Sequence, residues 1–278
     1  MRLSSGKEIH CWGGLGSQLF GIALALDLRH KYSVLKLVFH NSGVTRRDLE
    51  AKEFIERICN FSVVDDYSHE EKVKSNRSRF TLRSAISKIA KLTGVLNEAN
   101  TDHQFYRIYP WTKQIRGHYS YRRQKLSTLS FMRSEFLKIY GSQCQVEEEL
   151  VVHYRLDDIV NLPGKTVISK ERVAGEISKL TECSKVKVFS DSPKRVEDDL
   201  KSLIAKELFV SDAETEFLVA SALKSKFFVG TVSKVSFWIV FLRISHDKNS
   251  FNLMPVESRV HLQNALGELS VYESLSFY

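Results

Sequence analysis

The stretch that decides the fold is "CWGGLGSQLFGIALALDLRHKYSVLKLVF", residues 11 to 39, in which three glycines separate an apolar strand from an apolar helix. Its pattern predicts a strand over 8–12, a helix over 16–31 and a second strand over 34–39. These elements form one β-α-β unit, so the two strands lie parallel in one sheet. Glycines at such a connection let the backbone approach a ligand or a neighbouring strand closely. The glycine connection is therefore the first candidate for a binding site.

The second half of the chain repeats this alternation. The strand that starts at Glu149 is followed by further elements at regular spacing, which predicts a second parallel sheet. Most of these strands run into a polar residue or a glycine turn, where open α/β sheets bind ligands. We expect two Rossmann-type α/β domains, residues 1–147 and 148–278, with a C-terminal tail that can pack back. The expected helices are 169–180, 192–204, 212–225 and 234–244, and the expected strands are 185–191, 207–211 and 226–230.

Composition indicates a soluble globular protein. The 278 residues are 43% hydrophobic and 27% charged, which is typical of a packed domain and not of a disordered or fibrous chain. The first residues lack an apolar leader, and the longest apolar run, Phe227–Leu242, contains Lys234 and is short for a membrane span. The four cysteines lie far apart without a C-x-x-C pair, which favours a reducing cytoplasm.

The formal net charge of +8 suggests an anionic partner. Part of the charge is concentrated in residues 72–91, which carry seven basic and no acidic side chains. Leu82, Ala85, Ile86 and Ile89 recur there at helical spacing. The segment is either an interfacial helix that meets an anionic membrane surface or an ordinary surface helix with a solvated basic face. No recognised nucleic-acid-binding motif accompanies the charge, so no nucleic-acid partner is expected.

The glycine loop fits two common nucleotide motifs poorly. Gly14 and Gly16 supply the first two glycines of the dinucleotide fingerprint, but Leu19 stands where the third belongs. The second strand ends at His40 and Asn41, without the acid that would hold a ribose. No Gly-Lys-Ser/Thr follows, so the loop is not a P-loop.

The complete sequence of the loop and of the helix after it matches another motif better than either of these two. "GGLGSQLFGIALAL" resembles the opening motif of glycosyltransferase family 11, the α-1,2-fucosyltransferases. Four further segments resemble motifs of that family in the same order, so the resemblance covers most of the chain. Three departures stand out: Ser17 replaces an asparagine, and Leu156 and Asp157 replace an arginine and a glycine. The four segments are "GHYSYRR" (117–123), "HYRLDD" (153–158), "VFSDSP" (188–193) and "ASALKSKFFVGTVSKVSFWIVFL" (220–242).

This resemblance implies a GT-B-like fold, with two Rossmann-type parallel-sheet domains facing a cleft. It also implies an inverting transfer of L-fucose from GDP-fucose to a hydroxyl of a glycan acceptor, α-1,2 to galactose, without a metal or other cofactor. The expected setting is surface-polysaccharide biosynthesis such as O-antigen assembly. The acceptor is then a glycan, lipid-linked or free, and the enzyme is cytoplasmic or peripheral to the inner membrane. The chain contains no D-x-D triplet, in keeping with metal-independent chemistry.

The donor motif supplies the candidate catalytic residues. A leaving diphosphate without a metal needs a fixed cation, and Arg155, at the tip of a strand, can grip phosphate oxygens bidentately. His153, two residues earlier, either hydrogen-bonds the donor or is a satisfied core residue. Asp158 orients Arg155 or acts as the base that an inverting transfer needs, and Asp157 and Asp191 are the other carboxylates at strand ends.

Further residues are candidates for donor binding. The glycine loop is expected to approach the donor sugar and diphosphate, and two later strand ends carry hydroxyls suited to a phosphate site. Arg122 and Arg123 are secondary candidates for the diphosphate. The expected donor-binding set is Gly14, Gly16, Ser17, Gln18, Arg155, Ser190, Asp191, Thr231, Ser233, Lys234 and Ser236.

Other functions stay open at this point. Leu156 and Asp157 motivate the same fold with another GDP-sugar. The first β-α-β unit motivates an NAD(P)-dependent oxidoreductase, against which the missing third glycine and the missing acid argue. An inactive glycan-binding relative of the enzyme is the last alternative.

Overall fold

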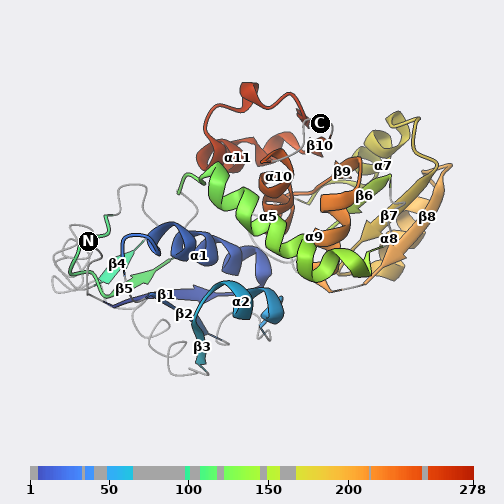
Figure 1. Ribbon diagram of the computed structural model, residues 1–278. Helices are drawn as coiled ribbons and strands as arrows, with labels where there is room; N and C mark the ends of the chain where they lie inside the picture. Colours follow the sequence, from blue (N-terminus) through green and yellow to red (C-terminus); the bar gives the residue numbers. More distant parts are fainter. Residues whose placement is uncertain are drawn as a thin grey trace, which may run out of the picture. The chain divides into compact units, whose positions relative to one another are not determined.

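The computed structural model describes residues 6–32, 35–40, 49–64, 98–100, 107–117, 122–144, 149–156, 167–212, 214–245 and 250–278. The chain divides into two compact units, Met1–Thr128 and Leu129–Tyr278. Both are built on parallel sheets with helices packed on them (Figure 1).

The first unit begins with the predicted β-α-β arrangement, which is confirmed. Strand β1 (Lys7–Trp12) leads through the glycine loop into helix α1 (Leu15–Leu28) and on to β2 (Leu35–His40). Ile9 of β1 lies opposite Leu37 of β2 and Ile115 of β5, and both pairings are parallel. The sheet order is β3-β2-β1-β5-β4, so β1 is central. The remaining elements are α2 (Lys52–Ile58), β3 (Phe61–Val64), β4 (Glu98–Asn100) and β5 (Gln114–Arg116).

Helix α1 is apolar on nearly all sides, and eleven of its fourteen residues are buried. Such a helix is stable only inside a core. It packs against β1 and β2 (Figure 1). The unbroken apolar run after the glycines therefore decides where the first core forms.

Two elements of the first unit lie in a stretch, residues 48–75, that is polar and has no regular apolar spacing over its length, so the sequence analysis assigned no element to it. Helix α2 and strand β3 lie there. Phe54 and Ile55 of α2 are buried. With Ala51 and Ile58 they follow the i, i+3, i+4, i+7 spacing of a helix. The helix has seven residues, which is too short for this pattern to stand out among its charged neighbours.

The second unit contains the predicted strand–helix alternation, which is confirmed element by element. Its C-terminal part then adds strands and a helix that the sequence analysis did not assign. The elements are β6 (Leu150–His153), α7 (Lys170–Lys179), β7 (Lys185–Phe189), α8 (Pro193–Lys201), β8 (Glu207–Ser211), α9 (Thr215–Lys224), β9 (Phe227–Val229), α10 (Lys234–Ile244), β10 (Phe251–Met254), α11 (Arg259–Leu266) and β11 (Leu275–Phe277), with short 3-10 turns η2 (Val256–Ser258) and η3 (Leu269–Val271).

The six-stranded sheet of the second unit has the order β8-β7-β6-β9-β10-β11, and its paired strands run parallel. Numbered along the chain, this order is 3-2-1-4-5-6, the Rossmann topology. The direction of winding reverses between β6 and β9. Open α/β sheets bind ligands beside such a switch point, at the carboxyl ends of the strands. The predicted fold class, α/β with two Rossmann-type parallel-sheet domains, is confirmed.

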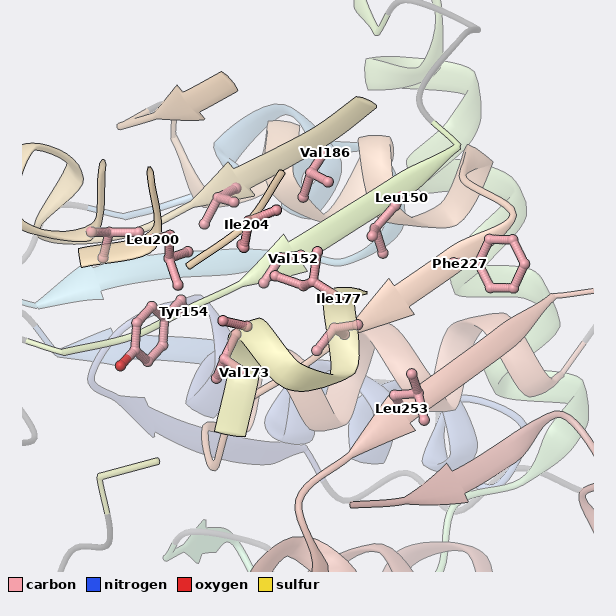
Figure 2. Close-up of a cluster of buried hydrophobic side chains, with 14 of the residues drawn as sticks. Leu150, Val152, Tyr154, Val173, Ile177, Val186, Leu200, Ile204, Phe227 and Leu253 are labelled. Carbon is pink, nitrogen blue, oxygen red and sulfur yellow. The ribbon is translucent and has the colours of Figure 1, made fainter. Parts of the chain in front are cut away.

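The core on one face of this sheet shows why the alternation folds. Figure 2 shows Val173 and Ile177 of α7 beside Val152 of β6. Valines of β7 and residues of α8 such as Leu200 join the same cluster. Alternate strand residues supply one face, since side chains on a strand alternate between faces. The other face carries His153 and meets α9 and α10.

Helix α5 (Leu126–Tyr140) and the short turn η1 (Gly141–Gln143) belong largely to the second unit. Arg133 donates to the carbonyl of Leu223 on α9 (3.3 Å), and Lys224 donates to the carbonyl of Gly141 (2.6 Å). These contacts divide the chain after Thr128, whereas the sequence analysis set the division after residue 147.

The long apolar run of residues 227–242 is split between β9 and α10, and nearly all of it is buried. Within the described ranges, no helix combines the length and the apolar character that crossing a membrane requires.

Candidate functional site

Polar residues follow three adjacent strands of the second unit at their carboxyl ends. Arg155 follows β6, Ser190 and Asp191 follow β7, and Thr231 follows β9. Because these strands are parallel neighbours, their ends share one edge of the sheet at the switch point. The structure thus brings together candidate donor-binding residues that the sequence analysis named in this half.

Both neighbouring strand ends fix the backbone at Arg155. Asp191 accepts a hydrogen bond from the amide of Leu156 through Oδ1 (2.8 Å), and its Oδ2 lies 4.0 Å from Nε of Arg155. Thr231 accepts from the amide of Arg155 (3.3 Å) and donates to the carbonyl of His153 (3.0 Å). The Arg155 side chain is 27% exposed, so a positioned guanidinium reaches solvent at this edge.

The first turn of α10 forms the other wall. Ser233 is the N-cap and accepts from the amide of Ser236 (3.0 Å). Nδ1 of His153 lies 2.8 Å from Oγ of Ser236 and 3.4 Å from Oγ of Ser233. His153 is 7% exposed, so it is buried beneath this turn. In the structure it positions the two serines, while its predicted catalytic role stays a prediction.

Helix N-termini attract anions because their first amides have no helical acceptor. Lys234, the first residue of α10, is half-buried and adds a cation to this turn. Ser190 is buried, and its Oγ accepts from the amide of Ser192 (3.1 Å), so it shapes the β7 exit. The edge therefore combines an arginine, a lysine, hydroxyls and a helix N-terminus, which together suit a diphosphate.

Gly230 lets the β9–α10 turn pack tightly. A Cβ on it would lie 2.5 Å from Sδ of Met254 and 3.0 Å from both Cε1 of Phe228 and Cβ of Ser236. The hydroxyl of Tyr278 donates to the carbonyl of Gly230 (2.8 Å). Burial raises the pKa of Tyr278, so its phenol stays protonated as a donor at neutral pH. The C-terminal strand thereby supports the turn that carries Thr231.

We expect Gly230→Ala to lower the free energy of unfolding by about 1–3 kcal/mol, the usual cost of overpacking a core. The added methyl should also displace Ser236 and with it the first turn of α10. Urea unfolding measures the loss of stability. Gly175→Ala is the matched control, since a Cβ there meets no atom within 4 Å. Unchanged stability in Gly230→Ala would contradict the close packing of this turn.

The glycine loop of the first unit is held by its own residues. Gly13 has φ of +78°, which glycine adopts without strain, and Gly14 is the N-cap of α1. Nε2 of Gln18 donates to the carbonyl of Gly13 (2.9 Å), and the Gln18 side chain is buried at 5% exposure. Gly16 is buried in the first turn, and the amide of Ser17 donates to the carbonyl of Gly14 (2.9 Å).

A carboxylate already lies at the N-terminus of α1. Oε2 of Glu50 accepts from the amide of Leu15 at 3.1 Å. An acidic side chain there is stabilised by the helix dipole, as a bound phosphate would be. Leu15 is therefore engaged by the chain itself, and a diphosphate would have to displace Glu50 from this amide.

Arg122, a secondary candidate for binding the diphosphate, is engaged in a buried ion pair. Arg122 forms a buried ion pair with Asp27 of α1, and burial lowers its pKa to about 10. Asp27 also accepts from Thr128, so both arginine and carboxylate are tied into the first unit.

Asp157, Asp158 and the basic segment 72–91 lie outside the described residues. Among the described residues, no three His, Cys, Asp or Glu side chains are grouped so as to hold a metal ion, and metal independence stays a prediction.

Three residues that shape these sites were missed by the sequence analysis: Glu50, Gly230 and Tyr278. A glycine directly after an apolar strand could have indicated Gly230. Glu50 and Tyr278 act across 35 and 48 residues of chain, and no local pattern predicts such contacts.

No protein-family profile matches the chain, and no curated protein matches it. Solved structures do match. A family 9 glycosyl transferase from Veillonella parvula is 10% identical, with 91% of this chain and 82% of that chain covered and a TM-score of 0.47. POFUT1 in complex with GDP-fucose is 11% identical (90% and 97% covered, TM-score 0.47). The Escherichia coli heptosyltransferase WaaC is 11% identical (91% and 88% covered, TM-score 0.44). The case for an activity rests on the residues of the site.

Proposed function

We propose that the protein is an inverting glycosyltransferase that uses a GDP-sugar, with GDP-fucose as donor and a glycan hydroxyl as acceptor. The observation that carries the proposal is the placement of Arg155 at the switch point of a Rossmann sheet, between Asp191 and Thr231. The choice of donor comes from the order of the five family 11-like segments. Galactose as the α-1,2 acceptor, surface-polysaccharide assembly and a lipid-linked form of the acceptor belong to the same proposal.

In the proposed reaction the bond between the sugar carbon and the GDP oxygen breaks while the acceptor oxygen attacks from the opposite side. The negative charge that develops on the diphosphate is stabilised by the Arg155 guanidinium and the first amides of α10. The acceptor proton passes to a carboxylate. Asp191 is engaged by the amide of Leu156 and lies beside Arg155, which favours Asp157 or Asp158 as that base.

The glycine loop has a narrower proposed role than the sequence suggested. Because Glu50 holds the amide of Leu15, the loop is assigned to the sugar and not to the diphosphate. Gln18 keeps the loop in shape through the carbonyl of Gly13.

We expect Gln18→Ala to lower kcat/KM for transfer about tenfold, the value of roughly one hydrogen bond at a site. GDP affinity should be unchanged, because GDP lacks the sugar. Steady-state transfer and calorimetric GDP titration separate these outcomes, and Gln263→Ala, on the surface of α11, is the control. Full transfer activity in Gln18→Ala would remove the loop from the site.

Of the alternatives, another GDP-sugar donor keeps specific support, whereas the NAD(P)-dependent oxidoreductase does not. Leu156 and Asp157 depart from the family pattern, which favours testing other GDP-sugars. An NAD(P)-dependent oxidoreductase would place its pyrophosphate at the start of α1, where Glu50 puts a carboxylate instead. Strand β2 also ends in His40, which is no acid for a ribose.

Isothermal titration without metal tests the proposal, with GDP, GDP-fucose, GDP-mannose and NADH as ligands. Binding of GDP and tighter binding of GDP-fucose than of GDP-mannose would support it. Tighter GDP-mannose binding would favour the other-donor alternative, and binding of NADH alone would favour the oxidoreductase. A folded protein that binds none of the four would overturn the proposed activity.

A further inference from the structure

The first unit contains a cavity of about 530 Å³ that none of the residues discussed above explains. It lies where α1 and α2 end and where β2 and β3 begin, and its lining includes Leu26, Leu35 and Ile58. Since α1 has 14 residues, about 1.5 Å each, the cavity is roughly 21 Å along the helix from the glycine loop. Its volume is in the range of small-molecule sites.

The lining combines apolar walls with a basic rim. Arg29, His30 and Arg57 line the cavity and are exposed to solvent. One acidic residue, Glu56, also belongs to the described lining, and its Oε1 lies 3.6 Å from Nζ of Lys52. The rim therefore has a positive charge, and guanidinium groups bind phosphate and carboxylate bidentately.

A tyrosine is part of the wall between the apolar residues and the rim. Tyr32 lines the cavity at 1% exposure, and its Oη is buried, so the hydroxyl does not open into the cavity. Nζ of Lys7 lies 4.2 Å from the centroid of its ring. The tyrosine therefore contributes to the wall, and the charged contacts come from the rim.

The cavity carries no thiolate that would repel an anion. Cys59 lines it, and burial, opposed in part by Arg29, raises the pKa of this thiol to about 12. At neutral pH the sulfur is therefore protonated and adds an uncharged surface to the apolar wall.

We propose that this cavity binds an anionic amphiphile, with its phosphate or carboxylate on Arg29 and Arg57 and its apolar chain against Leu26, Leu35 and Ile58. The ligand is either a dispersed amphiphile or the headgroup region of an anionic lipid, since both present this chemistry. The site is separate from the proposed transfer site and does not depend on the proposed activity.

Calorimetric titration with decyl phosphate, below the concentration at which it forms micelles, tests the site. The wild type should bind it more tightly than inorganic phosphate or decanol. Arg29→Ala/Arg57→Ala should weaken binding about a hundredfold, since two charge-assisted contacts are lost. Arg195→Ala/Arg259→Ala, which removes two exposed arginines of the second unit, is the matched control and should bind as the wild type does.

Pelleting with phosphatidic acid vesicles identifies the source: arginine-dependent pelleting assigns the ligand to the membrane, and its absence beside decyl phosphate binding assigns a dispersed ligand. Equal affinity of the wild type and the double variant for decyl phosphate, or equal binding of inorganic phosphate, would overturn the proposal.

Discussion

Arg155→Ala should lower the rate of sugar transfer by about a hundredfold to a thousandfold, the usual cost of removing one donor to a developing oxyanion. Arg155 follows β6, and the two neighbouring strand ends hold the backbone there: Thr231 accepts from its amide, and Asp191 accepts from the amide of the next residue, Leu156. GDP affinity should fall with the rate, because in the proposed reaction the same guanidinium binds the diphosphate before transfer. Initial rates with GDP-fucose and calorimetric GDP titration are the measurements.

Two further variants make this result specific. Arg155→Lys keeps the charge but loses the planar fork, so we expect an intermediate rate. Arg195→Ala removes an arginine of α8 whose side chain is 57% exposed, and it should transfer sugar as the wild type does. Thermal unfolding should be nearly the same for all three, since Arg155 lies at the surface edge of the sheet. Wild-type GDP affinity in Arg155→Ala would place the diphosphate elsewhere.

The parts of the fold that the sequence predicts are those in which apolar residues recur in a regular pattern over a long stretch. Helix α1 and the alternation from β6 to α10 carry such patterns, because each strand and helix there must bury a continuous face. The grouping of the residues that follow β6, β7 and β9 was predictable once the strands were recognised, because parallel strands bring their carboxyl ends to one edge of the sheet. Arg155, Asp191 and Thr231 are together because the order of the strands requires it.

The elements that the sequence missed are short or depend on distant partners. Strand β11 has three residues, and it exists because it pairs with β10. Glu50 and Tyr278 act through contacts with Leu15 and Gly230, which are remote in sequence. The sequence also could not show that His153 lies beneath the serines of α10, because that depends on side-chain packing across the sheet.

The far end of α10 contains a charged side chain that is almost completely buried. Arg243 is 1% exposed and lies in the last turn of the helix. Its Nε donates to Oδ1 of Asn252 (2.6 Å), and its guanidinium donates to the carbonyls of Ala222, Ser225 (2.8 Å) and Lys226 (3.0 Å). One side chain therefore joins the end of α9 to the starts of β9 and β10.

Arg243→Met should lower the free energy of unfolding by at least about 3 kcal/mol. Methionine replaces the aliphatic part of arginine but reaches only about as far as Nε and donates no hydrogen bond, so several buried carbonyls lose their donor at about 1–3 kcal/mol each. That is a large share of the 5–15 kcal/mol that stabilises a typical domain. Urea unfolding should show a lower midpoint with an unchanged slope, and Arg195→Met, on exposed α8, is the control.

The same variant separates stability from chemistry, because the two ends of α10 have different tasks. The N-terminal turn meets the proposed diphosphate, and the C-terminal turn holds the strands together through Arg243. Arg243→Met should therefore retain the wild-type GDP affinity, measured per folded molecule at low temperature, while it unfolds at lower urea. A wild-type midpoint would mean that water or other donors satisfy those carbonyls. A lowered GDP affinity in fully folded Arg243→Met would mean that the position of the Ser233 turn depends on the far end of the helix.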